Sequence, residues 1–425
     1  MESPIVIEHR DALVYTLNQA AELEHGIMCQ YLFAAFSMKT GEDEGLTSRE
    51  LTAIRRWHKI VTQVATEEML HLALVNNMLA ALGAAPRVGR PNLPHRGRYY
   101  PPGVQLALVP FGERALRHFL FLERPEGISI PDAEGFDPLG EAEPLMDETA
   151  IVPRPQHFQT VGYLYRSIER GFHRLVEKYG EEWVFIGDER SQATPEAFYW
   201  KDLIPVVDLE SAIQAVGIVV EQGEGPRGHW RDAHYGRFLE VLGEYLTLKR
   251  ERPEFEPAHP VVPAHVRQPV DADAMLICTD PLTARISDSF NVAYEILLFL
   301  LARFFAHGHE DDEQLQTLAD AAVLVMIKLM KPLGEALTAM PLGPEHPDLN
   351  AGPSFEVFHF SGYLLPHTRQ AWILIHERML VLEGYLRSAL ADGAPPEIEI
   401  VADDMARIAA SLAAKMPGLE ARPSP

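Results

Sequence analysis

A glutamate and a histidine three residues apart, Glu68 and His71, are the pair in this chain best suited to metal binding. Residues three apart on a helix lie on the same face, so both side chains point the same way. Their neighbours are mainly leucine, methionine and valine, among which an isolated charge is costly. Carboxylate oxygen and imidazole nitrogen are ligands for divalent transition metals. The pair therefore indicates either a metal site or a buried histidine hydrogen-bonded to its glutamate, and partner helices must decide.

The helix before this pair offers a second carboxylate. Glu24 and Tyr31 are seven residues apart, so they share one helical face, and that face is otherwise apolar. Glu22 lies beside Asn18 and Cys29 instead, which makes Glu24 the better candidate. Its alternative is a partly hydrated glutamate near the middle of a helix.

Two segments later in the chain supply further carboxylates. Glu169 shares a face with Tyr165, four residues earlier, and Glu221 follows directly after the apolar run 215–220. Glu67 lies about a quarter-turn from Glu68, and we expect it to form a salt bridge or to support a ligand from behind. Tyr31 and Tyr165 are interpreted either as hydrogen-bond or electron donors beside the site, or as packed residues with a satisfied hydroxyl.

The source of a second imidazole is open. No histidine follows Glu221 by three residues, and on a continuous helix His234 would lie on nearly the opposite face. The glycine- and proline-rich segment 223–228 argues against a continuous helix, so a bulge there could bring His234 to the site. His173 is the alternative.

The elements that would position these residues are helices, because apolar residues recur at three- and four-residue steps. Thr47 and Glu50 form a capping-box pattern that opens the second of them. In the first 250 residues we predict helices over 11–38, from 47 to 83, 112–122, 157–178, 203–222 and 231–248. In the remainder we predict helices over 286–307, 315–340, 361–391 and 403–415.

We therefore predict an all-α protein. Two long helices, a long crossover and two further helices form the connectivity of four-helix bundles that hold paired metal ions. Residues 84–155 are rich in proline and read as a crossover insertion within a first domain of residues 1–250. A proline-rich linker, 251–270, precedes a second helical bundle domain of residues 271–425, to which we assign a packing or substrate-shaping role.

The composition of the chain limits the classes of molecule that it is expected to bind. The net charge of −24 argues against nucleic acid and against an anionic membrane surface, and it suits small cations or small molecules. Cys29 and Cys278 are too few for a disulfide framework, which favours a reducing cytoplasm. The longest apolar run, 296–302, is too short to span a membrane, and no signal peptide is visible at the start.

The motifs together resemble a known family. Glu24 with Tyr31, Glu68 with His71, Glu169 and Glu221 look like a rubrerythrin- or ferritin-type dinuclear site. The residue sequences of four segments more specifically resemble the ferritin-like family that includes the iminophenyl-pyruvate dimer synthase domain: 22–25, 67–71, 221–225 and 234–238. That domain is found in violacein- and rebeccamycin-type pathways. The resemblance covers about the first 250 residues and implies a dinuclear carboxylate metal site in a four-helix bundle.

From these residues we predict a di-iron oxidoreductase that uses dioxygen and an external reductant on a small organic substrate. Manganese or zinc would suit the same ligands. Glu68 and Glu221 would bridge the metals, Glu24 and Glu169 would bind terminally, and His71 and His234 would each bind one metal. One alternative, which rests on the resemblance, is an enzyme that dimerises amino-acid-derived imines. Another is non-catalytic metal storage. The sequence leaves a homodimer open.

Overall fold

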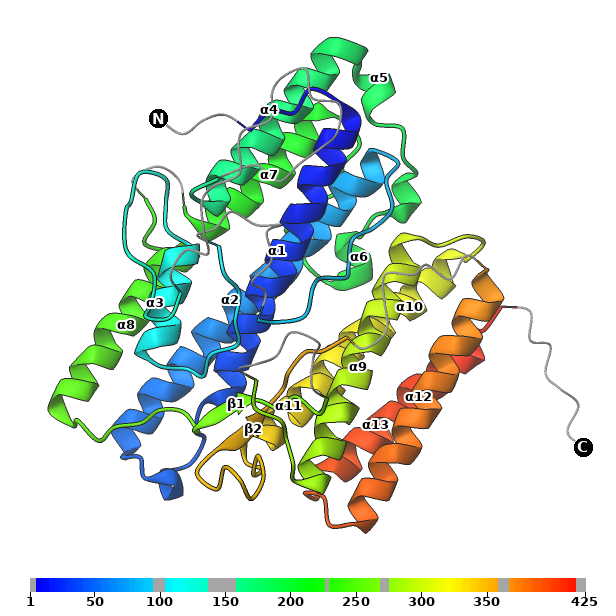
Figure 1. Cartoon of the computed structure of the whole chain (residues 1–425). Helices are drawn as coiled ribbons and strands as arrows, with labels where there is room; N and C mark the ends of the chain where they lie inside the picture. Colours follow the sequence, from blue (N-terminus) through cyan, green and yellow to red (C-terminus); the bar gives the residue numbers. More distant parts are fainter. Residues whose placement is uncertain are drawn as a thin grey trace, which may run out of the picture. The chain divides into compact units, whose positions relative to one another are not determined.

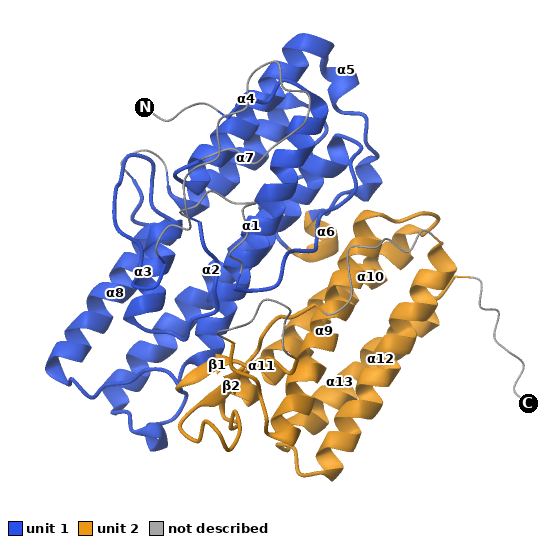
Figure 2. Cartoon of the chain, viewed as in Figure 1, with its two compact units in different colours: residues 1–194, 200–259 blue, residues 195–199, 260–425 orange. Residues whose placement is uncertain are grey.

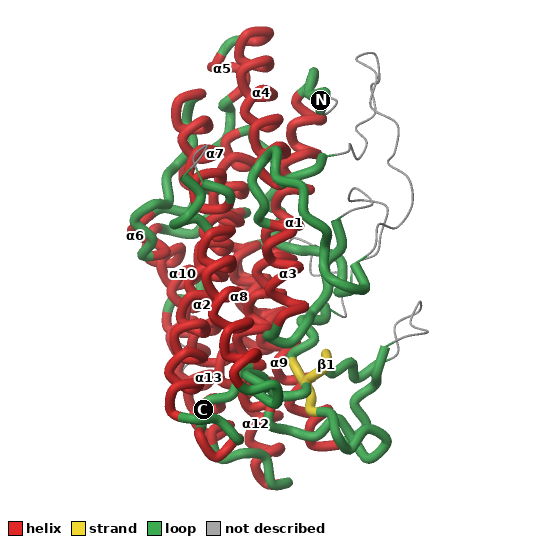
Figure 3. The backbone as a smooth tube through the Cα atoms, turned by 90° about the vertical axis from the view of Figure 1, so that its left-hand side faces the viewer, coloured by secondary structure: helices red, strands yellow, loops and turns green. Residues whose placement is uncertain are grey.

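The computed structural model describes residues 5–94, 104–136, 158–225, 229–267, 275–357 and 367–417. Within these residues almost all regular structure is helical (Figure 3), so the predicted all-α fold class is confirmed. The chain divides into two compact units, coloured separately in Figure 2: residues 1–194 with 200–259, and residues 195–199 with 260–425. The change from one unit to the next falls within the predicted linker 251–270. Parts of the predicted crossover and linker (95–103, 137–155 and 268–270) lie outside the described residues.

Two uninterrupted helices, α1 (Arg10–Ser37) and α2 (Ser48–Ala81), run antiparallel through unit 1 (Figure 1). α2 begins at the predicted capping box, where the backbone N–H of Thr47 donates to Glu50 Oε2 at 2.7 Å. Most residues of α1 are buried along its whole length. A polar side chain in the middle of α1 must therefore find its partners inside the protein.

The third and fourth positions of the unit 1 bundle are each occupied by two successive helices instead of one long helix. One consists of α3 (Glu113–Leu122) and α4 (Val161–Tyr179), and the other of α7 (Leu209–Gly223) and α8 (His234–Glu251). α4 packs on α7 toward one end of the long pair, and α3 packs on α8 toward the other (Figure 1). Pro125 follows the end of α3, and Gly225, with φ of +82°, follows the end of α7. Helix ends, rather than helix middles, therefore lie halfway along the bundle.

Unit 2 is a second helical bundle with one small parallel sheet. β1 (Val261–Pro263) pairs with β2 (Asn350–Gly352), with Val261 opposite Asn350. Its helices are α6 (Pro195–Phe198), α9 (Pro281–Phe305), α10 (Asp312–Val325), the π-helical turn η3 (Met326–Met330), α11 (Lys331–Thr338), α12 (Thr368–Ala391) and α13 (Glu397–Ala414). Unit 1 also contains η1 (Glu42–Glu44), α5 (Glu181–Val184) and η2 (Glu189–Ser191). In the described part of the chain, no helix combines the length and apolar character required to cross a bilayer.

A buried ion pair in unit 2 predicts how stability depends on pH. Arg303 donates to both oxygens of Glu310, at 2.6 and 2.7 Å, and Trp372 donates to the same carboxylate. Burial opposes ionisation, but these donors outweigh it and lower the pKa of Glu310 to about 2. The ionised carboxylate thus stabilises the folded state above its ordinary pKa of 4.5, and this contribution disappears as the pH falls through 2.

We expect Glu310→Gln to destabilise the protein by about 3–5 kcal/mol at pH 7, because the buried Arg303 loses its carboxylate partner. Urea unfolding followed by circular dichroism at several pH values measures this difference. The gap from wild type should narrow as the pH approaches 2. Glu313→Gln is the control, since Glu313 pairs with Lys415 on the surface and should change stability by less than about 1 kcal/mol. A loss for Glu310→Gln that does not vary with pH would contradict the assignment.

Candidate metal centre

The first carboxylate of the candidate centre lies midway along α1. Glu24 is buried, and the hydroxyl of Tyr165 on α4 donates to its Oε1 atom at 2.6 Å. This bond leaves the other oxygen, Oε2, facing α2, where it lies 3.7 Å from His71 Nδ1. α1 thus presents one hydrogen-bonded and one available carboxylate oxygen.

The Glu68–His71 pair on α2 faces this oxygen. His71 Nδ1 lies 2.9 Å from Glu68 Oε2, and both side chains are buried. The spacing of three residues places the two groups on one helical face, as expected. Glu68 has a second oxygen, Oε1, directed toward α8. The Glu68 carboxylate therefore lies between two sets of partners.

His234, the first residue of α8, completes the opposite side. Its Nδ1 atom lies 2.8 Å from Glu68 Oε1 and 3.6 Å from Oε2 of Glu123. Although this nitrogen is buried, it has no partner in hydrogen-bonding geometry among the described residues. His234 Nδ1 and the two carboxylate oxygens beside it are therefore arranged as ligands of a common ion would be.

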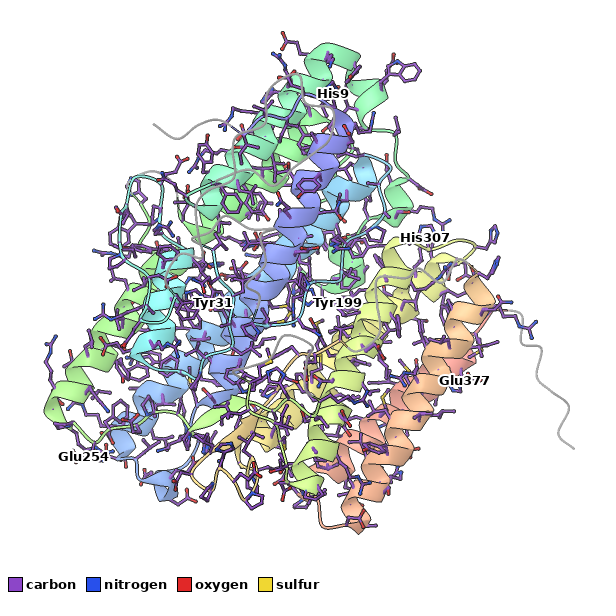
Figure 4. The ribbon with its side chains drawn as sticks, viewed as in Figure 1. His9, Tyr31, Tyr199, Glu254, His307 and Glu377 are labelled. Atoms are coloured by element: carbon purple, nitrogen blue, oxygen red, sulfur yellow. The ribbon has the colours of Figure 1, made fainter. Side chains whose placement is uncertain are left out.

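Glu123, which follows the last residue of α3, mirrors Glu24. The hydroxyl of Tyr31 donates to Glu123 Oε1, and Oε2 faces His234. Tyr31, labelled in Figure 4, also packs edge-on against Phe119 of α3, with ring centroids 4.5 Å apart. In both halves of the centre, then, a buried tyrosine occupies one oxygen of a carboxylate and leaves the other available.

These residues form two buried groups that share one carboxylate. One group is Glu24, Glu68 and His71, and the other is Glu68, Glu123 and His234. Within each group the ligand atoms lie within 4.8 Å of one another. The two imidazole rings are nearly parallel, with centroids 5.5 Å apart. Such an arrangement suits two cations bridged by Glu68.

Each imidazole binds a polar group through the nitrogen that faces away from the centre. His71 Nε2 lies 2.9 Å from Gln222 Oε1 at the end of α7. His234 Nε2 lies 2.8 Å from Glu67 Oε2, and Arg237 holds the same carboxylate at 2.7 Å. An acceptor at Nε2 places the proton there and leaves Nδ1 free to bind a metal. Glu67 thus forms the expected salt bridge, with Arg237, and lies behind the candidate ligand His234.

The buried carboxylates of the centre raise the pKa values of the groups around them. Burial and the neighbouring Glu68 raise the pKa of Glu24 to about 8. Burial would lower the pKa of His71, but Glu68 and Glu24 outweigh it and raise the pKa to about 10. Burial likewise opposes the shift at His234, where Glu123 and Glu68 raise the pKa well above its usual range. Protons on the imidazoles thus balance the carboxylates, and divalent cations would displace those protons. Three carboxylates and two imidazoles fit iron, manganese or zinc.

The structure brings together four of the six metal ligands predicted from the sequence and leaves two outside. The four are Glu24, Glu68, His71 and His234. Glu169 is half-buried on α4, and Glu221 is exposed on α7; neither belongs to the two groups. Gln222, one residue beyond Glu221, takes the inward face of α7, because one residue turns a helix by about 100°. On α4 the hydroxyl of Tyr165, one turn before Glu169, is the group that reaches Glu24. The alternative imidazole, His173, is exposed.

Sequence reasoning missed Glu123 because it follows a short helix within the proline-rich crossover. A usable signal was present: Ala115, Phe119 and Glu123 are spaced by four, and the first two are buried. Glu123 is thus the carboxylate that ends an apolar stripe. The interruption that was expected to bring His234 inward lies between α7 and α8, as the sequence indicated.

An ion-pair network holds the broken helix ends next to the centre. Arg166 of α4 pairs with Glu224 at the end of α7 and with Glu126 beyond α3, the latter at 2.9 Å. The backbone N–H of Glu126 also donates to Glu224. A Cβ atom at Gly162 would lie 2.2 Å from the Glu224 carboxylate, so a larger residue there would require the Glu224 side chain to shift. The network joins both breaks and thereby fixes the segments that carry Glu123 and Gln222.

Comparison with known proteins agrees with this geometry. A family model described as ferritin-like matches residues 17–243, more than half of the chain. The chain belongs to the ferritin-like family. The resemblance predicted from the sequence is thereby confirmed. The ferritin-like region contains every residue of both candidate ligand groups.

Two curated relatives are similar to most of this ferritin-like chain. It is 28% identical over 387 residues to dichlorochromopyrrolate synthase from Lentzea aerocolonigenes, with 83% of this chain and 36% of the relative covered. It is 26% identical over 370 residues to 2-imino-3-(indol-3-yl)propanoate dimerase from Chromobacterium violaceum, with 80% and 33% covered. The chain thus spans about a third of the length of these relatives.

A solved structure shares the fold. The crystal structure of a ferritin-like protein from Caulobacter vibrioides matches with a TM-score of 0.51 at 18% identity. The match covers 83% of this chain and 100% of that chain. At this level of identity, the likeness concerns the fold.

Proposed function

We propose that unit 1 binds two iron ions and uses dioxygen to oxidise a small organic substrate. The observation that carries this proposal is the pair of buried ligand groups that share Glu68. Bound iron would pass electrons from the substrate to dioxygen and would supply the positive charge that the buried carboxylates require. Manganese and zinc suit the same ligands, so the choice of iron follows from the oxidative reaction.

The side chains have distinct tasks in this proposal. Glu68 would offer one oxygen to each ion, and His71 and His234 would each offer Nδ1. Tyr165 and Tyr31 hold one oxygen of the terminal carboxylates, Glu24 and Glu123, so that each binds through the other oxygen. These fixed hydrogen bonds keep the ligands oriented before any ion arrives.

The small number of ligands leaves room for reactants. Each ion would have three protein ligands, which leaves positions open for substrate or dioxygen. Tyr31, Phe119 and Phe238 pack together beside the centre, with ring centroids 4.5–5.3 Å apart. These buried rings would keep water from this side of the centre, which would strengthen the electrostatic interactions of the charged ligands.

The curated relatives favour a more specific form of the reaction. One of them is named as a dimerase of an imino acid that carries an indole ring. We propose as the second candidate function that this chain joins two aromatic imines derived from amino acids. Each imine would lose one hydrogen atom as a carbon–carbon bond forms between them, and one dioxygen would take both hydrogens to become hydrogen peroxide. No other oxidant is needed.

Oxygen uptake tests both forms. We expect iron-loaded protein to consume dioxygen when supplied with the imine that indole-3-pyruvate forms in ammonium buffer. Mass spectrometry should detect a product two hydrogens lighter than two substrate molecules. Glu68→Ala should reduce uptake to the rate without protein, because it removes the ligand that both ions share.

Glu221→Ala is the matched control, because Glu221 is an exposed glutamate of α7 that lies outside both groups. It should retain the wild-type rate. Equal oxygen uptake by wild type and Glu68→Ala would reject the oxidative function. Uptake that depends on Glu68 but yields a monomeric oxidised product would reject dimerisation and retain the oxidation.

A further inference from the structure

The two halves of the centre are alike except for the group behind each imidazole. Each half has the shared Glu68, one terminal glutamate with a tyrosine hydroxyl on its outer oxygen, and one imidazole facing inward through Nδ1. Behind His71 lies the neutral amide of Gln222, at 2.9 Å. Behind His234 lies the carboxylate of Glu67, at 2.8 Å. The two halves of the centre therefore differ in the charge of the group that contacts the outer nitrogen of each imidazole.

The charge of the acceptor changes the imidazole as a ligand. A carboxylate that accepts the Nε2 proton raises the electron density and basicity of Nδ1 more than a neutral carbonyl does. Arg237 contacts both oxygens of Glu67, at 3.2 and 2.7 Å, and so holds the carboxylate in place. Arg237 partly offsets the negative charge of Glu67, but the Glu67 carboxylate still accepts the hydrogen bond from His234 Nε2. His234 should therefore bind a cation more strongly than His71.

We propose that Glu67 and Gln222 are positioning residues that make the two metal positions unequal. This inference rests on the proposed two-metal site. The position formed by Glu68, Glu123 and His234 fills first and binds its cation tightly. The position formed by Glu24, Glu68 and His71 fills second, and its cation exchanges more readily.

Titration of metal-free protein with cobalt(II), followed by its visible spectrum, tests the proposal without an activity assay. Wild type should bind two ions in two resolved steps. Glu67→Gln should weaken the first step by roughly 10–100-fold, the usual effect of losing a partner behind a ligand. Gln222→Glu should tighten the second step by a similar factor, so that the two steps approach each other.

The substitution at Gln222 separates positioning from general disruption, because a damaged fold would not increase affinity. Glu221→Gln, one residue away and exposed, should leave both steps unchanged. Two equal steps in wild type would overturn the inference, as would a Gln222→Glu variant that binds more weakly than wild type. Wild type that binds no cobalt would instead reject the proposed two-metal site, and the inference with it.

Discussion

Replacing Glu68 with alanine is expected to remove both metal ions at once. Each of its oxygens belongs to a different ligand group, 2.9 Å from His71 Nδ1 on one side and 2.8 Å from His234 Nδ1 on the other. Without it each group retains one carboxylate and one imidazole, too few to hold a cation tightly. The metal content measured after dialysis should fall from two ions per chain to nearly none.

Replacing Glu68 should also remove one buried negative charge from the metal-free protein. Burial opposes ionisation of Glu68, yet His71 and His234 hold its pKa well below its usual range. Glu68→Gln preserves the size of the side chain and should lose the metals equally. Glu169→Gln is the control, because Glu169 lies on α4 outside both groups and should retain two ions. Two ions per chain in Glu68→Ala would contradict the proposed site.

Replacing Glu123 with alanine should remove one ion and leave the other. Glu123 belongs only to the group of His234, where its free oxygen lies 3.6 Å from Nδ1. The group of Glu24, Glu68 and His71 remains complete in the variant. Metal analysis should therefore give one ion per chain, with the affinity of the lost position reduced by more than the roughly 10–100-fold typical of a partner behind a ligand.

Glu221→Ala provides the paired measurement, because Glu221 was predicted as a ligand from the apolar run before it and is exposed in the structure. It should keep both ions. A single ion in Glu221→Ala together with two ions in Glu123→Ala would favour the ligand set expected from the sequence over the one proposed from the structure. Circular dichroism spectra of the variants would show whether their helical content is preserved.

Much of the fold followed from local patterns. The apolar spacing and the capping box at Thr47 and Glu50 predicted α1 and α2 to within a few residues, because helices of this length repeat one pattern many times. The crossover was harder to predict. Its prolines indicate where helices end, but they do not indicate which short helix returns to the bundle.

The residues of the candidate centre divide in the same way. Glu68 and His71 could be paired from the sequence, because three residues on one helix define their relative direction. Glu24 followed from the apolar face that it interrupts. Glu123 ends an apolar stripe that the sequence contains, but the stripe does not show that α3 packs beside the pair, because breaks separate α3, α4, α7 and α8. Which face of α7 points inward, and so the choice of Gln222 over Glu221, depends on how α7 packs. Each break resets the rotation of the helix that follows.

Local periodicity alone was enough to specify the helical class of this chain and the glutamate–histidine pair at its heart. Only packing between broken helices selected which oxygen atoms complete that pair and which polar groups stand behind the imidazoles. The reason is physical: hydrogen bonds within a helix relate residues along one segment, whereas contacts across segments depend on how their separate faces fit together.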